Sequence, residues 1–72
     1  MNWFVQLMLR RAEDALIRKH GVSRGFVREI MANNRAYRHD LVSISQWMWA
    51  VRDIQMRYPD DFALVGDVDT TW

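Results

Sequence analysis

The tripeptide Gly21-Val22-Ser23 constrains the fold of this chain most, because it both ends one helix and starts another. Glycine readily adopts the left-handed backbone conformation that closes many helices, and serine is a preferred N-cap residue. Val22 lies between them, where it can pack back on Ile17 and forward on Val27. We therefore predict a tight turn between two helices, with Gly21 at positive φ.

Three helices joined by short loops are expected, at about residues 2–20, 24–36 and 44–58. The first is rich in strong helix formers and has Asn2 as its N-cap. The third has the strongest start signal, a capping box formed by Ser43 and Gln46, and Pro59 closes it. No segment alternates with period two over the length of a strand. The predicted fold class is all-α, a small three-helix domain, with a short turn at 60–65.

We expect one domain at 1–65, followed by a short acidic tail at 66–72 that is mobile except where Trp72 holds it. A domain this small buries only about 60% of its unfolded surface, so its stability margin is thin. The chain has no cysteine for a disulfide staple, and small unstapled domains often gain stability by oligomerising. The lack of cysteine also fits a reducing compartment, so we expect a cytoplasmic protein.

Apolar residues at helical spacing predict the inward face of each helix. In the first helix these are Phe4, Val5, Met8, Leu9, Ala12, Ala15 and Leu16. In the second they are Phe26, Val27, Ile30 and Met31. In the third they are Ile44, Trp47, Met48, Val51, Ile54 and Tyr58.

Four apolar residues fall outside these stripes: Trp3, Leu7, Trp49 and Met56. Tryptophan and methionine are enriched at protein interfaces, and so small a domain has little interior left for them. We predict that these four residues form a dimer or partner interface. The alternative is that the tail covers Trp49 through Phe62, Leu64 or Trp72.

The charge is divided between the two halves of the chain. Residues 10–39 carry eight Arg or Lys against three acids, and residues 40–72 carry two against six, which gives +5 and −4. Opposite charges of this kind can steer a partner or a second copy of the chain.

Residues 16–30 resemble a helix-turn-helix, with the turn glycine at Gly21 and inward apolar residues at Val22, Val27 and Ile30. The resemblance departs from the motif at Ile17 and His20, where a small and an apolar residue are usual. It implies a nucleic-acid contact by the second helix. The residues expected to make that contact are Arg24, Arg28, Arg35 and Arg38.

Residues for chemistry are few: the chain has two histidines, no cysteine and no phosphate-binding loop. We expect no catalytic residues, no cofactor and no metal site. A membrane surface is not expected as partner, because the apolar arc of the first helix is needed for the core. The leading prediction is a non-catalytic helical interaction protein, a regulator, inhibitor or adaptor that docks on another macromolecule as a homodimer. The alternative is a helix-turn-helix-like nucleic-acid-binding protein.

Overall fold

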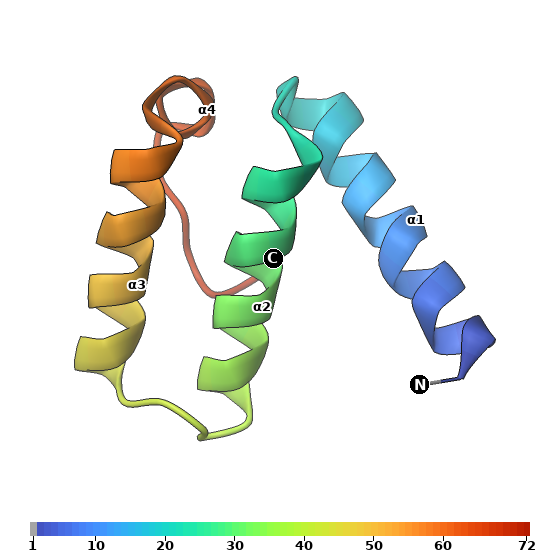
Figure 1. Ribbon diagram of the computed structural model, residues 1–72, viewed down its shortest axis with the longest axis horizontal. Helices are drawn as coiled ribbons and strands as arrows, with labels where there is room; N and C mark the ends of the chain where they lie inside the picture. The colour runs from blue at the N-terminus through green and yellow to red at the C-terminus, as the bar shows by residue number, and fades with distance from the viewer. Residues whose placement is uncertain (1) are drawn as a thin grey trace.

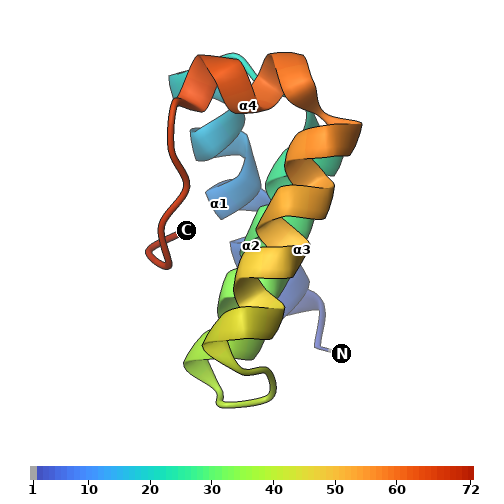
Figure 2. The ribbon, with the colours of Figure 1, turned by 90° about the vertical axis from the view of Figure 1, so that its left-hand side faces the viewer.

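The computed structural model describes residues 2–72, and every regular element within that range is a helix. The helices are α1 (Trp3–His20), α2 (Arg24–Arg38), α3 (Ile44–Arg57) and α4 (Pro59–Val65). Figure 1 shows α2 between α1 and α3, and Figure 2 shows α4 lying across the end of the molecule where α1 turns into α2. The all-α fold class is confirmed.

The predicted helix ends are confirmed by their caps. The Asn2 side chain accepts a hydrogen bond from the Phe4 amide at 2.7 Å, and Gly21 has φ 69°. Ser23 accepts from the Phe26 amide at 3.3 Å. The capping box at Ser43 is complete. These ends were predictable because each cap is satisfied within a few residues of sequence.

Helix α4 is a correction to the predicted three helices, since residues 60–65 were expected to form a turn. Pro59 both ends α3 and occupies the first turn of α4, where a missing backbone N–H costs nothing. Asp60 and Asp61 also lie in that first turn, where negative charge favours the helix dipole. Helix α2 also runs two residues beyond its predicted end, to Arg38.

The core is small and is built around α2. Its buried apolar residues are Val22, Phe26, Val27, Ile30, Ile54 and Val68. Phe26 meets the rings of Tyr58, Phe62 and Trp72 edge-on, with centroids 5.9 to 6.5 Å apart. Such aromatic contacts add to the free energy gained by burying apolar area. The core therefore joins the turn, α2, α3, α4 and the tail.

The inward faces predicted for α1 and α3 are partly wrong. Phe4, Val5 and Met8 are exposed on α1, and Ile44 and Met48 are exposed on α3. Only the last turns of α1 pack on the core, because α1 diverges from α2 toward its N-terminus (Figure 1). On α1, the side of the helix with the most apolar residues is thus not the side that faces α2.

Glu13 is the residue that orients α1. Its side chain is buried although it was assigned to the polar side. The carboxylate accepts hydrogen bonds from Arg24 at 2.8 Å and from Arg28 at 3.1 Å. Because a buried charge must be paired, these arginines hold the Glu13 side of α1 against α2.

The tail at 66–72 packs on α2 and the end of α1. Val68 is buried, and the Trp72 ring stacks on His20 with centroids 5.0 Å apart. Arg38 donates to the carbonyls of Thr70 and Trp72 at 2.8 and 3.2 Å. The tail is therefore held at several points along its length, rather than at Trp72 alone.

Asn34 connects the tail to α3 through a fully buried amide. Its Oδ1 accepts from Trp47 Nε1 at 2.7 Å, and its Nδ2 donates to the Asp69 carbonyl at 2.8 Å. Trp47 was predicted to face the core and is half-buried, with its indole N–H turned to Asn34. These two bonds satisfy the oxygen and one N–H of the Asn34 amide, which burial would otherwise leave without partners.

Candidate functional site

The outer face of α1 is an exposed apolar stripe. It consists of Phe4, Val5, Met8, Ala12 and Ala15, all of which are exposed. Counting 100° per residue, this stripe lies roughly 120° around the helix from the buried Glu13. The face therefore points away from α2, and no part of the chain between residues 2 and 72 buries it.

A cleft opens between α1 and α2 where the two helices diverge. It has a volume of about 510 Å³ and is lined by Trp3, Gln6, Leu7, Leu9, Arg10, Glu13 and Arg28. Among its lining residues, Trp3 is 73% exposed and Leu7 is 39% exposed. Two of the predicted interface residues thus line a half-polar cleft rather than a flat surface.

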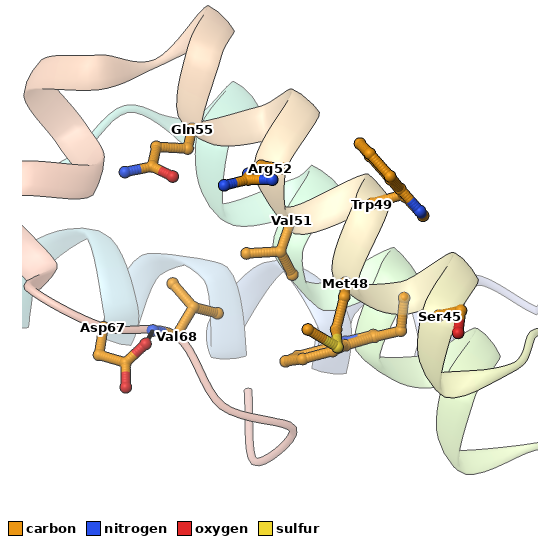
Figure 3. Close-up of a pocket in the computed structure, with 9 residues that line it drawn as sticks. Ser45, Met48, Trp49, Val51, Arg52, Gln55, Asp67 and Val68 are labelled. Atoms are coloured by element: carbon orange, nitrogen blue, oxygen red, sulfur yellow. Dashed lines mark hydrogen bonds between the residues drawn. The ribbon is translucent and has the colours of Figure 1, made fainter.

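The other two predicted interface residues, Trp49 and Met56, lie on the outer face of α3. Trp49 is 69% exposed and Met56 is 79% exposed. Beside them, a hollow of about 480 Å³ lies between α3 and the tail. In Figure 3, Met48 and Val51 extend from α3 toward Val68 of the tail, and Trp49 is also one of the residues that line this hollow.

The four predicted interface residues therefore do not form one patch. Trp3 and Leu7 lie on α1, Trp49 and Met56 lie on α3, and α2 separates the two helices (Figure 1). The tail does not cover Trp49, since Trp72 packs instead on His20 and Phe26. Each helix consequently presents its own apolar surface to solvent.

The arginines predicted to bind nucleic acid are largely engaged within the chain. Arg24 pairs with Glu13 at 2.8 Å and with Asp14 at 2.5 Å, and Arg28 pairs with Glu13 at 3.1 Å. The guanidinium of Arg38 is held by tail carbonyls. Among the residues described, only Arg35 of the four has no hydrogen bond or ion pair. Carboxylates of α1 thus pair with two of the four arginines, Arg24 and Arg28.

The pKa shifts follow these contacts. The hydrogen bond from Arg24 lowers the pKa of Asp14, and the hydrogen bonds from Arg57 lower the pKa of Glu29. Arg57 donates to both Glu29 oxygens, at 2.6 and 2.7 Å, and so links α3 to α2. Hydrogen bonds from Thr71 lower the pKa of Asp69 within the tail. Each of these three shifts is caused by a hydrogen bond to a named neighbour within the chain.

The described residues contain no group of three His, Asp or Glu side chains placed to hold a metal ion. Over the same residues, every buried polar side-chain atom has a hydrogen-bond partner. No helix in residues 2–72 is both long and apolar enough to cross a membrane.

Sequence reasoning missed the outer face of α1 and the pairing of Glu13 and Asp14 with α2. A signal for the pairing exists: the two acids lie seven and eight residues before Gly21, and Arg24 and Arg28 lie three and seven residues after it. In two helices joined by a short turn, residues at similar distances from the turn face each other, which applies to Arg28 and the two acids but not to Arg24.

Comparisons with protein-family models, with curated proteins and with solved structures gave no significant match.

Proposed function

We propose that this chain is a small non-catalytic helical interaction protein, a cytoplasmic regulator, inhibitor or adaptor that docks on another protein as a homodimer. The observation that carries the proposal is the excess of exposed over buried apolar side chains. Within residues 2–72, eleven large hydrophobic residues are exposed, whereas six hydrophobic residues form the buried core. Monomeric proteins rarely leave large contiguous apolar patches in water, and such patches mark interaction sites.

Two separate surfaces support both parts of the proposal. The outer face of α1 and the outer face of α3 lie on opposite sides of α2, so one can join two copies while the other meets a partner (Figure 1). Trp49 and Met56 suit the partner contact, because exposed tryptophan and methionine side chains supply large, adaptable apolar area. Arg52 lies between them in sequence and can fix the orientation of an acidic group on the partner.

The nucleic-acid alternative has less support. Binding duplex DNA through α2 requires free guanidiniums, and three of the four candidates already have acceptors in the chain. Releasing both Arg24 and Arg28 to bind DNA would leave the buried Glu13 carboxylate without a partner, which is costly.

A capture experiment tests the proposal. The tagged chain is used as bait in nuclease-treated lysate, beside Trp49→Glu and a control, Ala63→Glu, which places the same charge at an exposed position on α4. The proposal predicts a partner captured by the wild type and by Ala63→Glu but lost with Trp49→Glu, while helicity is unchanged. Capture that nuclease abolishes would support the nucleic-acid alternative.

A further inference from the structure

The outer face of α1 contains a heptad seam. Val5, Met8, Ala12 and Ala15 follow one another at spacings of three, four and three residues. This is the spacing of the a and d positions through which two helices pack side by side. All four residues are exposed, and the N-terminal half of α1 stands clear of the other helices (Figure 1).

The seam is complementary to itself in one orientation. Its residues run from large to small along the helix, from Val5 and Met8 to Ala12 and Ala15. An antiparallel pair places each large side chain against a small one, which fills the interface evenly. A parallel pair would place alanine against alanine and leave that end poorly packed.

We propose that two copies of this chain pair antiparallel through α1, with Val5 against Ala15 and Met8 against Ala12 of the second copy. The inference rests on the homodimer in the proposed function and identifies its surface. Antiparallel packing also places the positive end of each helix dipole beside the negative end of the other, which is electrostatically favourable.

The exposed area of the chain fits a second copy. A folded monomer of 8.7 kDa is expected to expose about 4,700 Å². The chain exposes 5193 Å², which is an excess of roughly 500 Å² per copy over that expectation. Two copies together thus have roughly 1,000 Å² to bury, near the lower limit for a specific interface.

The flanks of the seam distinguish the second copy from a lipid surface. Phe4, Arg11 and Arg18 follow the seam on one side. In the antiparallel pair, Phe4 faces Arg18 of the second copy, an arrangement that permits a cation–π contact. An anionic membrane would also attract these arginines, but Ala12 and Ala15 give it little apolar area, whereas they allow the backbone of a second helix to approach closely.

The same geometry places Arg11 near Arg11 of the second copy, close to the two-fold axis. These like charges repel, so a dimer of one wild-type chain and one Arg11→Glu chain is favoured over either homodimer. Arg10 is the matched control, since it is the neighbouring residue of the same type and points away from the seam.

The test mixes the wild type with Arg11→Glu and counts dimer species by native mass spectrometry. The proposal predicts a heterodimer fraction well above the statistical half, whereas mixing with Arg10→Glu gives about half. Ala12→Glu should raise the dimer dissociation constant at least tenfold and keep its helicity, because Ala12 is exposed in the single chain. Sedimentation and circular dichroism measure these two effects.

Three results would overturn the inference. If Ala12→Glu stays dimeric while Trp49→Glu becomes monomeric, the homodimer stands but its surface is α3. A statistical mixture with Arg11→Glu excludes the antiparallel pairing. If the wild type is monomeric and binds vesicles of phosphatidylserine and phosphatidylcholine through α1, the seam faces lipid and the homodimer itself fails.

Discussion

Replacing Asn34 with alanine tests whether its buried amide joins α2 to α3 and to the tail. The substitution removes two hydrogen bonds, one from Trp47 Nε1 at 2.7 Å and one to the Asp69 carbonyl at 2.8 Å. At about 1 kcal/mol each, the two bonds contribute about 2 kcal/mol, and the groups left without partners add up to about 1 kcal/mol. We expect Asn34→Ala to lower the free energy of unfolding by about 2–3 kcal/mol.

That loss is large for this chain. At the usual stability per residue, 72 residues give a free energy of unfolding of about 4–11 kcal/mol. The predicted loss corresponds to a fall in melting temperature of about 10–20 °C. Urea denaturation followed by circular dichroism measures the loss, and all proteins must be compared at one concentration because dimer stability depends on it.

The neighbouring residue provides the control. Asn33 is half-buried, and its Nδ2 donates one hydrogen bond, to the Trp47 carbonyl at 3.2 Å. Asn33→Ala should cost about 0.5–1 kcal/mol. If the two variants lose equal stability, or if Asn34→Ala loses less than about 1 kcal/mol, the buried amide does not join α2, α3 and the tail as described.

Three further predictions concern the turn, the pH dependence and the tail. Gly21→Val should lower the free energy of unfolding by more than about 1 kcal/mol in a urea titration, because φ is 69° at Gly21 and a β-branched residue resists that region. A Cβ added at Gly21 would meet no atom within 4 Å, so the loss reports on the backbone conformation, and unchanged stability would contradict the left-handed turn. The pKa of Glu29 lies below its ordinary value of 4.5 in the folded chain, so its contribution to stability is present above about pH 4.5 and is lost as the pH falls through the folded value. Glu29→Gln should therefore lose stability at pH 7 but match the wild type near pH 2, and an equal difference at both pH values would refute this. Removing residues 67–72 should cost at least about 2 kcal/mol by thermal melting, because burial of Val68 alone contributes about that much; a near-neutral truncation would mean that the tail is not docked.

The fold was predictable where its determinants are local. Asn2, Gly21, Ser23 and Ser43 act on backbone groups a few residues away, so their helix ends follow from the sequence. Helix α4 was missed because Pro59 can end one helix and begin the next, and only the first role was considered.

The orientation of α1 could not be predicted from hydrophobicity alone. Its most apolar arc was assumed to face the core, but the pairing of Glu13 with Arg24 and Arg28 turns that arc outward. Such pairs depend on contacts between helices, which a helical wheel does not contain. The exposure of Trp49 and Met56 was predictable, because both lie opposite the buried Ile54 on α3. Their separation from Trp3 was not predictable, because it depends on how the helices are ordered in space.

We infer that a second copy of this chain covers the apolar outer face of α1. Sedimentation equilibrium of the wild-type protein over a micromolar concentration series tests this claim most directly. We predict a molar mass that rises with concentration toward twice the 8.7 kDa of one chain. A mass that stays at 8.7 kDa throughout the series would contradict the claim.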